Sequence, residues 1–318
     1  MAEWLVEAGI GETRAVLVAD GRIVEARIVP EGELIAGTVI DARLIARIPE
    51  RNQGIVAWDG QEALVTPLPA GVTQGALARV EIVRPAIAEP GKPKRARARP
   101  SDADPVAGAL PAGRTLRPTD RDLFEEAGWS ELLEEAATGV VAFPGGELHI
   151  ALTPAMTLID VDGTLAPSAL AVAGARAAAE AIRRLDIAGS IGIDLPGAGD
   201  KAARHAAAAA IDAALPQPFE RTAVNGFGFI QIVRRRTRRS LSEIHAMEPA
   251  QAQARALLRR AERVGGAGAR TLTAHPTVIA TLTPSWIAEL ERRTGTRIIL
   301  RDDAALTISG GHVQAQFA

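Results

Sequence analysis

Two aspartates, Asp160 and Asp194, have the residue type and the setting that metal-assisted chemistry needs. Asp160 lies in the largely apolar stretch 155–163, and Asp194 lies in the stretch 190–195. Both stretches are predicted to be buried strands, and residues 170–185 between them carry apolar side chains at helical spacing. The right-handed crossover of a strand–helix–strand unit makes its two strands parallel. We therefore expect both carboxylates to emerge at the same edge of one sheet, where open α/β sheets bind ligands.

Converging carboxylates repel each other unless a cation lies between them or one of them takes up a proton. Mg²⁺ suits such a pair, because it is a hard cation that accepts one or two carboxylates together with waters and phosphate oxygens. The alternative is that each aspartate caps the helix that follows its strand, a common role for a single Asp. Because two acids are expected on adjacent strand ends, we favour metal binding over helix capping for Asp160 and Asp194. For Asp162 both roles, metal ligand and helix cap, remain alternatives. The sequence thus predicts Mg²⁺-assisted chemistry on a phosphate.

The absence of cysteine is the most restrictive feature of the composition. It excludes disulfides, thiolate zinc sites and cysteine nucleophiles. A hydrophobic content of 47% over 318 residues predicts a folded protein of two or three domains. The sequence has neither a secretory signal at its N-terminus nor an apolar run of about 18 residues. We therefore expect a cytoplasmic protein with no membrane partner.

The net charge of −2 conceals two local clusters of basic residues. Such clusters on a mildly acidic chain indicate an anionic partner that binds at local sites on the surface. The alternative for either cluster is a solvent-exposed surface with no partner. We expect the second cluster to follow a strand parallel to the acid-bearing strands, and so to lie beside the acids and hold phosphates. The clusters are Lys92, Lys94, Arg95, Arg97 and Arg99, and Arg234, Arg235, Arg236, Arg238 and Arg239.

The N-terminal third of the chain has the patterns of short strands. Residues 13–29 alternate apolar and polar side chains around Asp20-Gly21, which predicts a hairpin with a type I′ turn. Short β-rich runs then follow one another and fit a small barrel such as an OB-fold. Residues 86–119 are rich in Pro, Gly, Ala and basic side chains, and predict a flexible linker. The barrel runs are 38–48, 54–58, 63–66 and 78–83.

Helices and strands alternate in the remainder of the chain. A helix at residues 120–137, capped by Thr119, is predicted to precede the unit that carries the acids. A helix at 201–215 and a strand at 227–233 are predicted to follow it. The last segment again has a strand–helix–strand pattern, with a late turn at Gly310-Gly311. Its elements are expected at 271–274, 285–294 and 297–300.

With these residues in view, the chain resembles the bacterial ribonuclease E/G family. The densest similarity runs from Phe143-Pro144-Gly145-Gly146 to Asp162, resumes over residues 184–194, and returns at Phe227-Gly228 and the arginines after it. The opening residues 11–22 resemble the N-terminal strands of the family, and residues 290–298 resemble the small domain that follows its catalytic core. The resemblance touches most of the chain in order, and it is specific over residues 140–240.

The resemblance implies an α/β (α+β multi-domain) fold. Its catalytic core would be RNase H-like/DNase-like, with an inserted OB-fold β-barrel for RNA and a small C-terminal βαβ-type domain. The implied divisions are N-terminal strands that pair with the catalytic core (1–33), the barrel (34–86), a basic and Pro-rich linker (87–118), the catalytic α/β domain (119–245) and the C-terminal domain (246–318).

The implied activity is Mg²⁺-dependent endonucleolytic cleavage of single-stranded RNA that leaves a 5′-phosphate. By position, Asp160, Asp162 and Asp194 would be the catalytic residues. Asp160 and Asp194 would be the metal ligands, and Asp162 stands where the family has an Asn that contacts the phosphate. Single-stranded RNA and a second copy of the chain would be the partners. The residues expected to bind RNA are Lys94, Arg95, Arg97, Arg234, Arg235, Arg236 and Arg238.

The chain also departs from the family. The cysteine pair that links subunits through zinc is absent, so no zinc is expected. The part that elsewhere recognises a 5′-monophosphate end is missing between the barrel and Thr119. The extra negative charge of Asp162 near a phosphodiester is unfavourable unless it also binds metal. The chain thus resembles a minimised member of the family, and an RNA-binding protein that has lost catalysis is a second hypothesis.

A third hypothesis comes from the motif Asp160-Val161-Asp162-Gly163-Thr164-Leu165, which matches the first motif of haloacid-dehalogenase-like phosphatases. There the first Asp is a nucleophile and the second an acid/base. Gly199-Asp200-Lys201 also resembles a later motif of that superfamily. However, that fold needs several βα units between the two motifs, and only about forty residues separate them here. The five histidines show no metal-ligand spacing, so none is assigned to a site.

Overall fold

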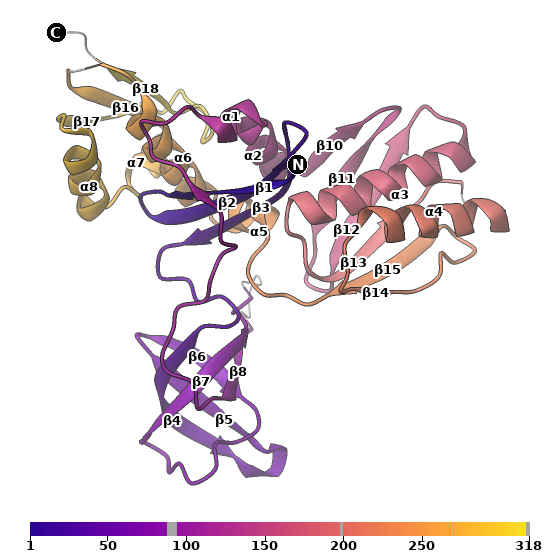
Figure 1. Ribbon diagram of the computed structural model, residues 1–318, viewed down its shortest axis with the longest axis horizontal. Helices are drawn as coiled ribbons and strands as arrows, with labels where there is room; N and C mark the ends of the chain where they lie inside the picture. Colours follow the sequence, from indigo (N-terminus) through magenta and orange to yellow (C-terminus); the bar gives the residue numbers. More distant parts are fainter. Residues whose placement is uncertain (88–93, 198–199, 267, 316–318) are drawn as a thin grey trace. The chain divides into compact units, whose positions relative to one another are not determined.

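The computed structural model describes residues 1–87, 94–197, 200–266 and 268–315 (Figure 1). The chain has a mixed α/β fold and divides into two compact units. The first is built from three separate segments, Met1–Glu31, Ala112–Thr138 and Leu241–Ala318. The second consists of Gly32–Pro111 and Gly139–Ser240. Among the described residues, none of the helices combines the length and the apolar character that crossing a membrane requires.

The first unit contains a four-stranded sheet in the order β3-β2-β1-β9. Its strands are β1 (Glu3–Ala8), β2 (Glu12–Ala19), β3 (Arg22–Pro30) and β9 (Arg114–Thr115). The predicted hairpin is confirmed: β2 and β3 are antiparallel, and Asp20 and Gly21 between them have φ of 50° and 75°. A type I′ turn needs positive φ at both positions, which Asp and Gly tolerate best.

The same unit contains a second sheet, in the order β17-β16-β18, and six helices. Parallel pairing of β16 with β17 across α8 confirms the predicted C-terminal strand–helix–strand unit. The strands are β16 (Arg270–Ala274), β17 (Ile298–Asp302) and β18 (His312–Ala315). The helices are α1 (Leu123–Glu126), α2 (Trp129–Thr138), α5 (Leu241–Met247), α6 (Pro249–Arg263), α7 (Pro276–Ile279) and α8 (Pro284–Thr294).

The helix predicted at 120–137 is two helices, α1 and α2. Gly128 between them has φ +94°, a left-handed conformation that ends a helix and that an L side chain rarely adopts. The first helix is capped by Asp122, whose Oδ1 accepts a hydrogen bond from the backbone N of Glu125 at 3.1 Å. The prediction that Thr119 is the cap was therefore wrong.

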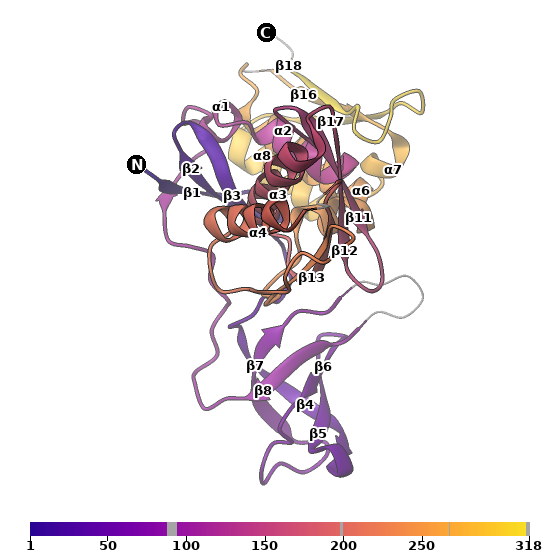
Figure 2. The same cartoon turned by 90° about the vertical axis from the view of Figure 1, so that its right-hand side faces the viewer.

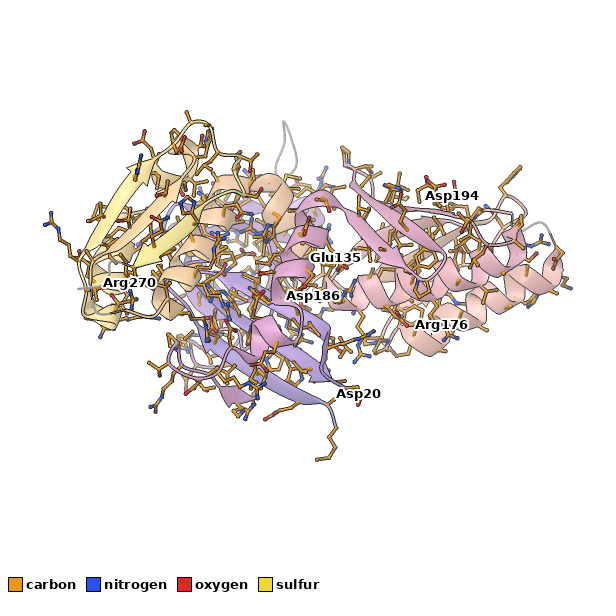
Figure 3. All side chains as sticks on the ribbon, turned by 90° about the horizontal axis from the view of Figure 1, so that it is seen from above. Asp20, Glu135, Arg176, Asp186, Asp194 and Arg270 are labelled. Carbon is orange, nitrogen blue, oxygen red and sulfur yellow. The ribbon has the colours of Figure 1, made fainter. Side chains whose placement is uncertain are left out.

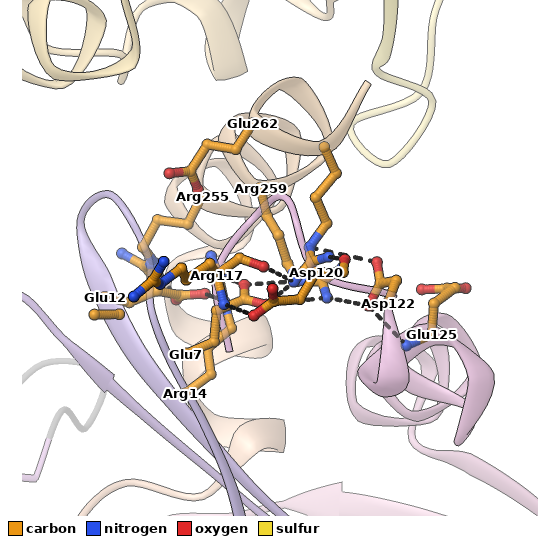
Figure 4. A network of polar contacts seen from close by, with 12 residues as sticks. Glu7, Glu12, Arg14, Arg117, Asp120, Asp122, Glu125, Arg255, Arg259 and Glu262 are labelled. Atoms are coloured by element: carbon orange, nitrogen blue, oxygen red, sulfur yellow. Dashed lines mark hydrogen bonds and ion pairs between the residues drawn. The ribbon is translucent and has the colours of Figure 1, made fainter. Parts of the chain in front are cut away.

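A network of charged side chains is buried in the first unit, between β1, β2, α1 and α6 (Figure 4). At its centre Glu7, only 2% exposed, accepts hydrogen bonds from Arg14 Nη1 at 2.5 Å, Arg259 Nε at 2.9 Å and Arg263 Nη2 at 2.6 Å. Burial alone would raise the pKa of Glu7, but the three guanidinium groups together hold this pKa below its ordinary value. The network therefore joins all three chain segments of the unit through ionised groups.

His245 on α5 is buried next to the same network and makes a pH-dependent contribution to stability. Burial lowers the pKa of His245 to about 4, Arg255 adds to this effect, and Glu12 opposes it. The unfolded chain, with an imidazole pKa near 6.5, therefore takes up the proton first as the pH falls. Stability should be unaffected by this group above about pH 6.5 and should decline between about pH 6.5 and 4, by roughly 3 kcal/mol.

Urea unfolding of the wild type and of His245→Asn at pH 7 and pH 4.5 measures this contribution. The wild type should lose more stability than the variant between these two values, because Asn binds no proton. Equal losses in both proteins would contradict the assignment.

The second unit contains a closed five-stranded barrel in the order β4-β5-β6-β8-β7. Strands β6 and β8 are parallel and the other pairs are antiparallel, which is compatible with an OB-like barrel. The bounds are β4 (Val39–Ile48), a 3₁₀ turn η1 (Pro49–Arg51), β5 (Gln53–Trp58), β6 (Gln61–Val65), β7 (Leu77–Arg84) and β8 (Ala96–Pro100).

Strand β8 lies within residues 87–118, so the prediction of a linker throughout this range was wrong. Ala96 and Ala98 are 5% and 2% exposed and complete the barrel core, while arginines alternate with them on the outside. Small alanines between arginines give almost no hydrophobic signal, which is why the strand was missed. Residues 88–93, including Lys92 of the basic cluster, lie outside the described residues.

The second unit also contains a six-stranded sheet in the order β10-β11-β12-β13-β15-β14. Helices α3 (Pro167–Arg184) and α4 (Lys201–Ala214) lie side by side against one face of it (Figures 1 and 2). The predicted strand–helix–strand unit is confirmed, because β12 and β13 are parallel. The strands are β10 (Val140–Phe143), β11 (Gly146–Leu152), β12 (Thr157–Gly163), β13 (Gly189–Asp194), β14 (Glu220–Arg221) and β15 (Phe229–Arg234).

The predicted divisions of the chain differ from this arrangement. The N-terminal strands do not pair with the sheet that carries the acids; β1 pairs with β2 and β9 in a sheet of its own. The predicted domain at 119–245 also included α1, α2 and α5, which cluster with the first unit. These helices are amphipathic and need an apolar surface to pack on, but the pattern of one helix does not say which surface that is.

Candidate functional site

Asp160 and Asp194 lie directly opposite each other on the parallel strands β12 and β13. Residues in register on neighbouring strands present their side chains on the same face of a sheet. Along β12, Ile159 and Val161 are buried, whereas Asp160 is exposed. Figure 3 shows Asp194 on the open side of the sheet, away from Arg176 of α3. The two residues thus lie in register on the face of the sheet opposite α3 and α4.

The position of the pair within the sheet differs from the prediction. Asp194 is the last residue of β13, but β12 continues beyond Asp160 to Gly163 because it stays paired with β11. The carboxylates therefore project from the flat face of the sheet and not from the loops at its edge. The helix-cap alternative is wrong for both, because Asp200 caps α4 and the N-cap of α3 is Ala166.

Strand β11 adds further polar groups to the same face. His149 is the register partner of Asp160, and Glu147 is the register partner of Asp162. The Nε2 atom of His149 lies 3.1 Å from Glu147 Oε1 and 3.9 Å from Asp162 Oδ2. Asp162 is thus an exposed strand residue next to an imidazole, not a helix cap. Sequence reasoning assigned no role to His149 or Glu147; the alternation of polar and apolar residues over 146–150 was the available signal.

The set of donors on this face fits a cation that needs few protein ligands. Within the described residues no group of three or more His, Cys, Asp or Glu side chains is arranged to hold a metal ion. Two carboxylates in register match Mg²⁺, which commonly takes one or two carboxylates and completes its octahedron with waters and phosphate oxygens.

The arginine run after β15 does not lie beside the acids, contrary to the prediction. Strand β15 is antiparallel to β13, so Phe229 faces Asp194 while Arg234 faces Gly189 at the opposite end of the strand. Residues 220–221 form the edge strand β14, and the chain reverses before β15 begins. The dipeptide Asn225-Gly226 is a common turn signal, and it indicates this reversal in the sequence.

At that opposite end the arginines contact the protein itself. Arg234 Nη1 donates to the carbonyl oxygen of Ile187 at 2.8 Å, and Arg236 Nη2 donates to that of Ala188 at 3.3 Å. Arg238 pairs with Asp186 at 2.6 Å. These side chains secure the start of β13, whereas Arg235 is exposed. These contacts account for Arg234, Arg236 and Arg238 without a ligand.

The basic residues of the barrel are on its outer surface. Arg95 pairs with Glu62 at 2.5 Å, and Arg99 pairs with Glu81 at 2.7 Å. Lys94 lies where its backbone bridges to Ile87, just before β8 begins. Arg97 is exposed on β8 and makes no ion pair within the described part of the chain.

The phosphatase-like motif is placed in a sheet of the wrong kind. Of the five strand pairings in this sheet, only β12 with β13 is parallel. Asp200, part of the second motif, is accounted for as the cap of α4, with Oδ1 accepting the Ala203 backbone N–H at 2.6 Å. Gly199 lies outside the described residues. Comparison with known proteins adds no assignment, since no family model and no curated protein matches this chain.

Proposed function

We propose that this protein is a Mg²⁺-dependent endoribonuclease that cleaves single-stranded RNA and leaves a 5′-phosphate. The observation that carries the proposal is the register pairing of Asp160 with Asp194 on the sheet face opposite α3 and α4. The resemblance of residues 140–240, which include both aspartates, to the ribonuclease E/G family also supports it. We assign this sheet to the RNase H-like/DNase-like class of nuclease cores and the barrel to the OB-fold class on the same basis.

In this proposal Asp160 and Asp194 hold the ion. When bound, Mg²⁺ would activate a water and stabilise charge on the scissile phosphate. His149 and Asp162 line the same face and would orient the nucleotide next to the phosphate. Helices α3 and α4 lie on the opposite face of the sheet, so within this unit they leave room for a polymer to lie across the face that carries the acids. This geometry, with the mostly antiparallel sheet, favours the nuclease over the phosphatase hypothesis.

Cleavage of a single-stranded oligoribonucleotide, with Mg²⁺ and with EDTA, tests the proposal. We expect 5′-phosphorylated products only when the metal is present. Intact RNA together with retained binding would instead support the non-catalytic RNA-binding hypothesis. Hydrolysis of a phosphate monoester without RNA cleavage would support the phosphatase.

The two basic regions should differ in their contribution to RNA affinity. Neutralising a phosphate releases counterions, so the slope of log K against log[salt] should become shallower by about 0.7 for each phosphate of single-stranded RNA that a variant no longer neutralises. We expect Arg97→Ala to weaken binding and to reduce this slope. Arg235→Ala removes the same charge at the end of the sheet opposite the acids and should leave the slope nearly unchanged. Equal effects of both variants would contradict this division of roles.

A further inference from the structure

Phe227 is a large aromatic side chain held in solvent next to the paired aspartates. It is 93% exposed, and among the described residues no other Phe or Trp falls in the exposed class. A single exposed hydrophobic residue is common and needs no explanation by itself. The position of Phe227 within the second unit is what gives its exposure a meaning.

The turn that carries Phe227 is closed by hydrogen bonds at both ends. Oδ1 of Asn225 accepts from the backbone N of Phe227 at 2.9 Å and from that of Phe229 at 3.0 Å. The backbone N of Asn225 donates to the carbonyl oxygen of Phe229 at 2.9 Å, and Gly228 supplies the φ of +90° that the turn requires. The aromatic ring therefore projects from a defined support.

This turn is attached to the strand end that carries Asp194. The backbone N of Leu195, the residue after Asp194, donates to the carbonyl oxygen of Gly228 at 3.2 Å. Phe229, two residues after Phe227, is the register partner of Asp194. The turn that carries Phe227 is thus joined, through backbone hydrogen bonds, to the end of the strand that carries Asp194.

The sheet face beside the turn is apolar close to the acids. A Cβ atom on Gly192 would lie 2.5 Å from Cζ of Phe229 and 3.0 Å from Cδ2 of Leu158, so the missing side chain gives room to both. Leu158 is 37% exposed on this face. A flat apolar surface next to two carboxylates offers both elements that a nucleotide needs, a surface for its base and a site for a phosphate-bound cation.

We propose that Phe227 stacks against one nucleobase next to the scissile phosphate and thereby sets where the RNA is cut. This inference rests on the proposed function and names a substrate contact within it. Stacking on an aromatic side chain tolerates every base, because each has a π-face, so the contact positions the strand without reading a sequence. Phe227 acts through substrate binding and has no role in proton or metal chemistry.

The test compares Phe227→Ala, Phe227→Trp and Phe227→Leu on an oligoribonucleotide with one cleavage site. Loss of one stacked base should lower kcat/KM by roughly 5- to 150-fold in the Ala variant. Trp should retain activity, and Leu, which is apolar but not aromatic, should resemble Ala. Ile308→Ala, which truncates a side chain 37% exposed in the other unit, is the matched control and should have no effect.

Substrates with one abasic nucleotide near the cleavage site locate the stacked base. At one position the abasic substitution should slow the wild type as much as Phe227→Ala does, and should add nothing in that variant. Additive losses at every position, or full activity of Phe227→Ala, would overturn the inference while leaving the nuclease proposal intact.

Fluorescence of RNA that contains 2-aminopurine separates the two proposals if no cleavage is seen. Quenching by the wild type that is lost in Phe227→Ala would support the stacking contact and refute the nuclease. Binding with quenching unchanged in Phe227→Ala would refute the stacking contact, and absence of RNA binding would refute both.

Discussion

Asp194→Asn should reduce Mg²⁺-dependent RNA cleavage by about 10³-fold or more. The change keeps the size of the side chain and removes one of two carboxylates that face each other on β12 and β13. A bound metal ion contributes several kcal/mol to stabilising charge in the transition state, and each 1.36 kcal/mol is a factor of ten in rate. Asp160→Asn should have an effect of the same order, since both carboxylates hold the same ion in this proposal.

Asp162→Asn is the matched comparison, because it removes the same charge from the same face two residues further along β12, at a residue that holds no metal in this proposal. Asp162 faces Glu147 on β11 and has no acid opposite it on β13. Cleavage should persist or increase, as expected where the resembling family has Asn. The measurement is the single-turnover cleavage rate with saturating Mg²⁺, with RNA affinity measured in parallel. Activity that survives in Asp194→Asn, or that is lost equally in all three variants, would refute the paired-aspartate site.

Glu7→Gln should lower the free energy of unfolding of the first unit by about 3–5 kcal/mol, the range found when one member of a buried ion pair is removed. Glu7 receives hydrogen bonds from Arg14, Arg259 and Arg263 in a site where Glu7 itself is 2% exposed. Gln would leave these guanidinium groups without the carboxylate that compensates their charge. Breaking a buried pair is costly for this reason, even where the intact pair adds little stability.

The pH dependence of this contribution has a defined sign. The pKa of Glu7 is lowered in the folded state, so the stabilisation is fully present above the ordinary carboxyl pKa near 4.5 and is lost as the pH falls through the folded value.

Glu289→Gln is the control, because Glu289 pairs with Arg292 and Arg293 on the surface and solvent screens the interaction. Its removal should change stability little.

Tryptophan fluorescence in urea reports on this unit once Trp58 of the second unit is replaced by Phe in every protein compared, because Trp4, Trp129 and Trp286 lie in the first unit. A protein of two compact units need not unfold in a single step, so the transition followed by these residues is the relevant one. If Glu7→Gln and Glu289→Gln unfold at the same urea concentration as the wild type, the buried network does not stabilise the unit.

Much of the local structure was predictable, since it depends on neighbouring residues. Asp20-Gly21 specifies a turn with two positive φ values, which only one kind of hairpin accepts. The spacing of two apolar runs and a helix made β12 and β13 parallel, because a crossover of that length has one favoured hand. The register of Asp160 with Asp194 followed directly from this crossover.

Other features could not be derived in this way. Strand β15 could follow α4 directly and run parallel to β13, or it could follow a chain reversal at Asn225 and run antiparallel. The pairing of β15 with both β13 and β14 determines that it is antiparallel. His149 gained its position only through pairing of β11 with β12. The partners of Glu7 on α6 lie about 250 residues away in sequence, so no periodicity connects them.

The sequence by itself determined the hairpins, the barrel strands that carry larger apolar side chains, and the parallel pair of acid-bearing strands, because turn chemistry, side-chain alternation and crossover handedness act over short distances. The tertiary structure alone decided that the acids lie on the sheet face opposite α3 and α4, that the arginine run lies at the opposite strand end, and that the N-terminal strands belong to the other unit. Those outcomes depend on which surfaces, distant in sequence, pack against one another. The free energy of that burial comes from many residues that no local sequence pattern relates.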